Sequence, residues 1–204
     1  KDYCIPKLFI INMVDKDQAD FDLVLAALKE RYGRTVFPFT LPVNPGPSFN
    51  QVADVMRKET FTFKTDGSGN YSSAEAEGDW VQKLEDLHKE LIELIAESDE
   101  GLMEIFFDKG ELGEDELRSG LHQAMKSDGL IPVFCVAGAS NIGVRRMMDI
   151  MAKYAPCAGD FEKVVGTKPG YDEEVTHGHS VSDPLAAIVF KTISEEHIGE
   201  MSFF

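Results

Sequence analysis

Two polar side chains follow an apolar run close to the start of the sequence. The run Phe9–Ile11 leads into Asn12, and Asp15 comes shortly after it. A carboxylate at the end of a strand can accept from both the ring N–H and the exocyclic amine of guanine, a pair of donors that adenine lacks. Met13, between them, can lay an apolar chain over a base but brings no charge. The pattern indicates a weakened guanine-binding site.

The same residues also have a simpler interpretation. An apolar strand with a polar tip is typical of the carboxyl edge of an open α/β sheet, where ligands bind. Asn12 and Asp15 would equally suit the approach to the helix expected over residues 20–32, because short polar side chains satisfy free N–H groups at a helix N-terminus. The residues alone leave both interpretations open.

A second strand, glycine loop and helix lie over residues 131–154. Gly138 and Gly143 have the spacing of a phosphate-binding loop, but Val144 and Arg145 stand where such a loop carries lysine and a hydroxyl residue. Without that lysine and hydroxyl, the loop has no group for the β- and γ-phosphates or for magnesium. A phosphate-binding loop is therefore not expected here.

Hydrophobic spacing and turn residues predict the elements that position these loops. The expected helices are residues 20–32, a seam from 79 to 94, 101–107, 114–125 and 144–154. The expected strands are residues 7–11, 35–43, 51–56, 60–64, 131–136, 185–193 and 201–204, with a turn at 66–70. Two βα units around a small antiparallel sheet and a group of helices predict an α/β fold.

Charge is unevenly distributed along the chain. The net charge is −16, and the stretch from Glu75 to Glu116 holds 16 acidic residues against Lys83, Lys89 and Lys109, a local balance of −13. A chain this acidic is not expected to bind nucleic acid directly, since that requires a basic surface. The acidic stretch is either a solvated helical surface or a docking face for a basic partner.

Other residue patterns exclude several classes of site. Cys4, Cys135 and Cys157 form no CxxC pair, and His177 and His179 have only acidic neighbours, so no metal site is expected. No apolar run approaches the roughly 20 residues that cross a bilayer, and the start has no signal-peptide pattern, which predicts a cytoplasmic protein without a membrane partner. The start at Lys1 and the end in mid-strand make us expect a fragment of a longer protein.

The order of motifs resembles that of bacterial elongation factor G, a translational GTPase, over essentially the whole chain. The motifs that carry the resemblance are Asn12–Asp15, Cys135–Gly138, Asn141-x-Gly143-Val144, Tyr154-x-Pro156, Asp183–Lys191, Gly199 and Phe203–Phe204. The resemblance implies that residues 1–43 and 129–158 form the carboxyl half of a P-loop GTPase-type domain with a partial parallel sheet. It also implies an inserted acidic α+β subdomain at 44–128, a linker at 159–183 and the first strands of a β-barrel domain at 184–204.

The resemblance further implies a degenerate guanine site made of Asn12, Met13, Asp15, Ala137 and Gly138. In the family, a lysine stands at position 13 and a serine at position 137, and the backbone N–H at Gly138 reaches the guanine carbonyl. Both recognition motifs therefore depart from the pattern in this chain. We expect guanine-nucleotide affinity to be weakened or lost, with GTP or GDP bound, if at all, in the full-length protein.

The implied function is ribosomal translocation during protein synthesis. The resemblance places the phosphate-binding loop and both switch segments before this chain, so no catalytic residue is assigned to it and no GTP hydrolysis is expected of it alone. The implied partners are the ribosome and, through the acidic insert, ribosomal stalk proteins. The alternatives are a ribosome-protection or release-factor relative, and a non-catalytic acidic protein-interaction module.

Overall fold

The computed structural model describes residues 5–110, 112–161, 163–168, 170–171, 173–195 and 199–204. Cys4 lies outside these residues. The chain divides into two compact units, Lys1–Pro156 and Cys157–Phe204, and each is described by itself. Within the described residues no helix is both long and apolar enough to cross a membrane.

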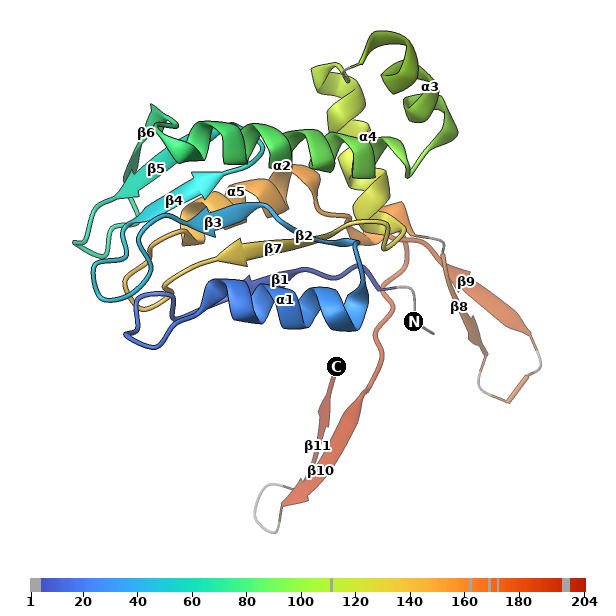
Figure 1. Ribbon diagram of the computed structural model, residues 1–204. Helices are drawn as coiled ribbons and strands as arrows, with labels where there is room; N and C mark the ends of the chain where they lie inside the picture. The colour runs from blue at the N-terminus through green and yellow to red at the C-terminus, as the bar shows by residue number, and fades with distance from the viewer. Residues whose placement is uncertain (1–4, 111, 162, 169, 172, 196–198) are drawn as a thin grey trace. The chain divides into compact units, whose positions relative to one another are not determined.

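A three-stranded parallel sheet lies in the first unit (Figure 1). Its strand order is β1 (Phe9–Ile11), β7 (Ile131–Cys135) and β2 (Val36–Pro38), with β7 in the centre. All five residues of β7 are buried, as expected for a central parallel strand covered on both faces. The sheet confirms the predicted α/β class and brings together strands from the two ends of the unit.

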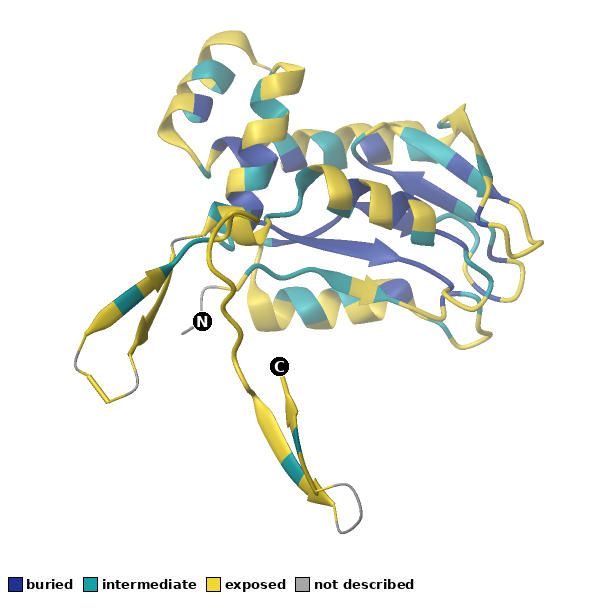
Figure 2. Ribbon diagram, turned by 180° about the vertical axis from the view of Figure 1, so that it is seen from behind, coloured by how far each residue is buried: buried dark blue, intermediate teal, exposed yellow. Residues whose placement is uncertain are grey.

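Helices α1 (Phe21–Tyr32) and α5 (Val144–Tyr154) follow β1 and β7 and lie on opposite sides of the sheet (Figures 1 and 2). The predicted start of α1 is confirmed, because the Asp20 side chain accepts from the Leu23 N–H and caps the helix. Each βα unit therefore presents its strand-to-helix loop at the carboxyl edge of the sheet.

A four-stranded antiparallel sheet continues from the parallel one. Its strands, in spatial order, are β3 (Thr40–Pro42), β4 (Gln51–Asp54), β5 (Glu59–Phe63) and β6 (Tyr71–Glu75). The strand predicted over residues 35–43 is divided at Phe39, whose N–H donates to the Val133 carbonyl at 2.9 Å and whose carbonyl accepts from the Val55 N–H at 3.0 Å. Phe39 thus joins the two sheets.

Strand β6 was not predicted from the sequence. Its residues alternate too weakly for a strand pattern, since Ser72 and Ser73 are both exposed polar residues. The strand forms because it completes the sheet beside β5, where Phe63 pairs with Tyr71 and Glu59 pairs with Glu75.

Three helices follow the antiparallel sheet in the chain: α2 (Asp79–Ala96) packs against β4, and α3 (Glu100–Lys109) and α4 (Glu114–Lys126) pack against α2. Leu84, Leu91 and Ile95 of α2 are buried in the core shared by both sheets. A Cβ added at Gly120 of α4 would lie 2.5 Å from Leu102, so the helices approach closely at this glycine. One continuous core therefore contains the parallel sheet, the antiparallel sheet and these helices.

The described residues of the second unit form two antiparallel hairpins and a short 3-10 turn. Their elements are η1 (Ala158–Asp160), β8 (Val164–Thr167) paired with β9 (Glu174–His177), and β10 (Lys191–Glu195) paired with β11 (Gly199–Phe203). The β8–β9 hairpin lies within the stretch predicted as a linker, residues 159–183, and was not predicted from the sequence, although Val164, Val165 and Val175 are strand-forming residues. The strand predicted over residues 185–193 begins only at Lys191.

Candidate functional site

The segments that follow β1 and β7 lie side by side at the carboxyl edge of the parallel sheet. The Val136 N–H donates to the Ile11 carbonyl at 3.0 Å, and the Val14 N–H donates to the Val136 carbonyl at 3.3 Å. These bonds extend the β1–β7 pairing beyond the strand ends. The structure therefore brings the predicted residues 12–15 next to the predicted residues 137–138.

The side chain of Asn12 connects the two segments. Its Oδ1 accepts from the backbone N–H of Met13 at 2.8 Å and from the backbone N–H of Gly138 at 2.9 Å. Two donors at one atom identify that atom as the amide oxygen. Gly138 was expected to offer its N–H to a guanine carbonyl, and in this structure that N–H is bonded to Asn12 instead.

Met13 and Asp15 extend from the same loop. Met13 has a φ of 63° and is 61% exposed, a left-handed conformation that is uncommon for a residue with a side chain. Such outliers gather at ligand-binding positions, where the surrounding contacts hold them. The Asp15 carboxylate is 21% exposed and lies 3.4 Å from Lys16 Nζ, so its oxygens remain within reach of solvent.

The loop after β7 is closed by its own backbone. Ala137 and Ile142 exchange two backbone hydrogen bonds, at 3.0 and 3.1 Å, and the Asn141 N–H donates to the Gly138 carbonyl at 3.3 Å. The Ser140 hydroxyl donates to the Ala137 carbonyl at 3.3 Å. Sequence reasoning noted the missing serine at position 137 but did not find that Ser140 supplies a hydroxyl to the same loop.

Two further segments contact this loop region. The Gly46 N–H donates to the Val14 carbonyl at 2.8 Å, which ties the β3–β4 connection to the β1 loop. On the other side, Asn141 Nδ2 donates to the Gly67 carbonyl at 3.2 Å. Neither contact was predicted, because neither segment carries a recognisable motif.

Cys135 stands directly beneath the loop and is structural. Its N–H and its Sγ both donate to the Thr40 hydroxyl oxygen, at 3.0 and 3.5 Å. Burial raises the pKa of the Cys135 thiol to about 12, against the opposing effect of the Thr40 hydrogen bond. At neutral pH the thiol is protonated and is no nucleophile.

A buried ion pair joins α5 to the antiparallel sheet. Arg146 Nε donates to Asp54 Oδ2 at 2.6 Å, and the two side chains are 9% and 0% exposed. The Arg57 N–H satisfies the other Asp54 oxygen at 2.9 Å. Burial alone lowers the pKa of Arg146, but the hydrogen bond and charge of Asp54 outweigh it, so that pKa is raised. The pair fixes the helix that follows the candidate loop.

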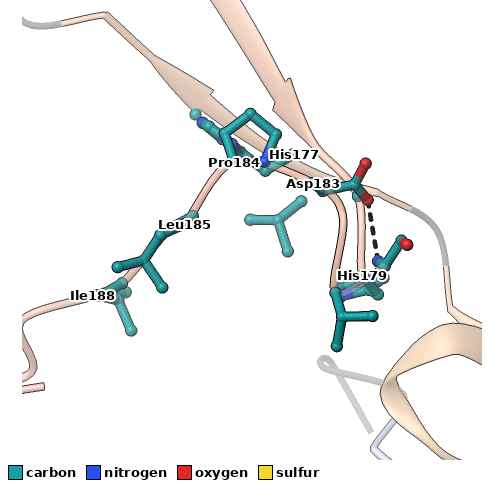
Figure 3. Close-up of a pocket in the computed structure, with 13 residues that line it drawn as sticks. His177, His179, Asp183, Pro184, Leu185 and Ile188 are labelled. Atoms are coloured by element: carbon teal, nitrogen blue, oxygen red, sulfur yellow. Dashed lines mark hydrogen bonds between the residues drawn. The ribbon is translucent and has the colours of Figure 1, made fainter.

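A hollow of about 910 Å³ lies within the second unit (Figure 3). Most of its walls are apolar, and Leu185 and Ile188 belong to them, while His177 and His179 contribute imidazoles. The Asp183 carboxylate accepts from the Ser180 N–H at 2.9 Å and so closes its own turn. Among the residues that the structure describes, no group of three or more His, Cys, Asp or Glu side chains is arranged to hold a metal.

No protein-family model matches this chain. Among solved structures, it is similar to a crystal structure of a protein from Thermus thermophilus, with a TM-score of 0.72 and 20% sequence identity. The match covers 97% of this chain and 26% of that protein, so the chain spans about a quarter of its length. At this identity the likeness shows a shared fold.

Proposed function

We propose that this chain supplies the base-recognising part of a guanine-nucleotide-binding protein. The observation that supports this most strongly is the hydrogen bond between Asn12 and the Gly138 N–H, at 2.9 Å, which joins the loops after β1 and β7 at one sheet edge. Ligands of open α/β sheets bind at this edge. Two separate stretches of sequence with matching chemistry thus meet where such a ligand binds.

In this proposal each segment has a defined task. The Asp15 carboxylate accepts from the ring N–H and the exocyclic amine of guanine, which distinguishes guanine from adenine. Met13 covers one face of the base with its thioether chain. Because Gly138 donates to Asn12 in the structure, its N–H must exchange that partner for the guanine carbonyl when a nucleotide binds. This exchange and the missing lysine at position 13 both weaken binding.

The wider proposal follows from the resemblance to elongation factor G. The full-length protein would then act in ribosomal translocation as a divergent P-loop GTPase-type factor located in the cytoplasm, with GTP and GDP as switch ligands. This chain contributes no residue to phosphoryl transfer in the proposal. Its acidic helices α2, α3 and α4 would face a basic partner such as a ribosomal stalk protein.

The test is the nucleotide affinity of the full-length protein, measured by calorimetry with GDP, GTP, ADP and ATP. The proposal expects weak binding that favours guanine over adenine, and Asp15→Ala should remove that preference. Asp17→Ala is the matched control, because Asp17 is an exposed acidic residue of the same segment. Equal affinity for GDP and ADP, or an equal effect of the two substitutions, would refute guanine recognition.

A non-catalytic interaction module is the second candidate function. It is favoured by the surface of α3, where Phe107 is 78% exposed between Glu104 and Asp108 on an acidic helix. Aromatic residues are enriched at protein interfaces. Co-sedimentation with ribosomes distinguishes the candidates: binding that changes with GTP supports the switch, whereas binding indifferent to nucleotide supports the module. Absence of ribosome binding would exclude the translation role.

A further inference from the structure

The β5–β6 turn, residues 66–70, lies against the loop and helix that follow β7. Asn141 Nδ2 donates to the Gly67 carbonyl at 3.2 Å, and Arg145 Nη1 donates to Asn70 Oδ1 at 3.2 Å. The two residues joined are 74 positions apart in the sequence in the first contact and 75 positions apart in the second. The turn therefore reaches the candidate base site from a separate part of the fold.

The turn is ordered by its own hydrogen bonds. The Ser68 N–H donates to Asp66 Oδ1 at 2.9 Å, and the Asn70 N–H donates to the Ser68 hydroxyl at 3.2 Å. Hydrogen bonds from the Ser68 side chain and backbone also hold the pKa of Asp66 below its usual value. Because its own hydrogen bonds fix its conformation, the turn can hold a neighbouring loop in position.

Asn141 carries the contact from the turn to the base site. Its backbone has a φ of 58°, and its N–H donates to the Gly138 carbonyl at 3.3 Å. Gly69 lies directly beside its side chain, because a Cβ added at Gly69 would stand 2.7 Å from Asn141 Nδ2. Any side chain at position 69 must therefore displace the Asn141 amide.

We infer that the β5–β6 turn is a positioning element for the guanine-binding loop, with Asn141 as the positioning residue. Asn12 holds Gly138 from the side of β1, and the turn holds the same loop from the side of the antiparallel sheet through Asn141. The inference rests on the proposed guanine site. It gives the antiparallel sheet, to which β5 and β6 belong, a role in the nucleotide affinity of that site.

The first experiment is Gly69→Ala in the full-length protein. The added methyl group displaces Asn141, and the GDP affinity should fall about tenfold, which corresponds to the loss of one well-placed interaction. ADP affinity should not change, so the selectivity for guanine falls with it. A purely structural role would lower the affinity for both nucleotides equally.

The control is Gly78→Ala. Gly78 also has a positive φ, 58°, but a Cβ added there meets nothing within 4 Å. It shares a positive φ with Gly69, whose φ is 69°, but an added Cβ would not touch the loop. Equal losses of GDP affinity in the two variants would overturn the inference.

A double variant tests the contact itself. Asn141→Gly suits the φ of 58° and removes the side chain that a Cβ at position 69 would strike. Adding Gly69→Ala to Asn141→Gly should then cause less than a twofold further loss, because non-additivity marks residues that act through one contact. Fully additive losses would contradict the inference.

Amide hydrogen exchange without nucleotide separates this inference from the proposed function. Exchange at Gly138 and Ile142 should accelerate in Gly69→Ala and stay at the parent rate in Gly78→Ala. If the protein without substitutions shows no preference for guanine, the proposed function is wrong. The exchange rates then still test whether the turn affects the loop. Unchanged exchange in Gly69→Ala would overturn that coupling.

Discussion

The backbone N–H of Gly138 donates to Asn12 Oδ1 at 2.9 Å, across 126 sequence positions. The same oxygen accepts from the Met13 N–H at 2.8 Å. One amide thus fixes the loops after both β1 and β7. In the proposed guanine site, the Gly138 N–H would have to leave Asn12 to donate to the base.

Replacing Asn12 with alanine should loosen this edge of the sheet. The N–H groups of Met13 and Gly138 lose their shared acceptor, which should cost about 1 kcal/mol of unfolding free energy, since the bond is exposed and water replaces it in part. Asn12→Asp is the control, because it keeps an oxygen acceptor in the same place. Urea unfolding measures both variants, and a loss in Asn12→Asp as large as in Asn12→Ala would show that the hydrogen bonds do not matter.

Replacing Met13 with lysine should strengthen nucleotide binding. Met13 is 61% exposed, so a side chain of similar length fits without disturbing the core, and its methylene stem can cover the base while its charge adds hydrogen bonds. We expect GDP affinity to rise about fivefold, equivalent to roughly 1 kcal/mol. Met13→Gln has similar reach without charge and serves as the control. The prediction fails if calorimetry shows the same gain for glutamine as for lysine.

Local patterns were sufficient to predict the central elements. The apolar runs before Asn12 and before Gly138 are short and bounded by polar or glycine residues, so each predicts a buried strand with a loop at its end. Both strands form, and β7 is fully buried, but β1 lies at an edge of the sheet and its Ile10 is 46% exposed, so the predicted burial of β1 is wrong. Strand β6 could not be found in this way, because Ser72 and Ser73 are adjacent polar residues and interrupt any alternation of apolar and polar side chains. Its pairing with β5, rather than its own composition, makes it a strand.

The support beneath the candidate site could not be predicted from sequence. Asp54 and Arg146 stand 92 positions apart, and each looks like an ordinary surface residue in its own stretch. Likewise, nothing near Asn141 indicates that Gly67 will accept its hydrogen bond. Contacts of this kind depend on how two sheets are joined at Phe39, which only the three-dimensional arrangement reveals.

Removing one partner of the buried ion pair should destabilise the protein strongly. Arg146→Met leaves the Asp54 carboxylate buried without its cation, which should cost about 3 to 5 kcal/mol of unfolding free energy. Asp54→Asn added to Arg146→Met should recover part of this loss, because the neutral amide still accepts from the Arg57 N–H. Urea unfolding measures each variant.

The control for this pair is Arg34→Met. Arg34 contacts Glu97, but their side chains are 75% and 39% exposed, so the loss should stay below about 1 kcal/mol. Similar losses for Arg34→Met and Arg146→Met would show that burial does not set the strength of the Asp54 interaction.

The two described cysteines should differ in reactivity. Cys157 is exposed and should react with iodoacetamide at pH 8, whereas buried Cys135, whose thiol pKa is raised to about 12, should react only after unfolding. Peptide mapping by mass spectrometry identifies which residue is alkylated. Labelling of Cys135 in the folded protein at a rate close to that of Cys157 would contradict its burial.

The same thiol should make stability depend on alkaline pH. The folded-state pKa of about 12 exceeds the ordinary value of 9.0, so the unfolded state loses its proton first as the pH rises. This contribution to stability is complete below pH 9.0 and declines progressively above it towards pH 12. Cys135→Ala lacks the thiol, so its unfolding free energy should decline less steeply between pH 9.0 and the upper limit of the measurement. Parallel pH profiles for the two proteins would show that Cys135 ionises in the folded state as readily as in the unfolded one.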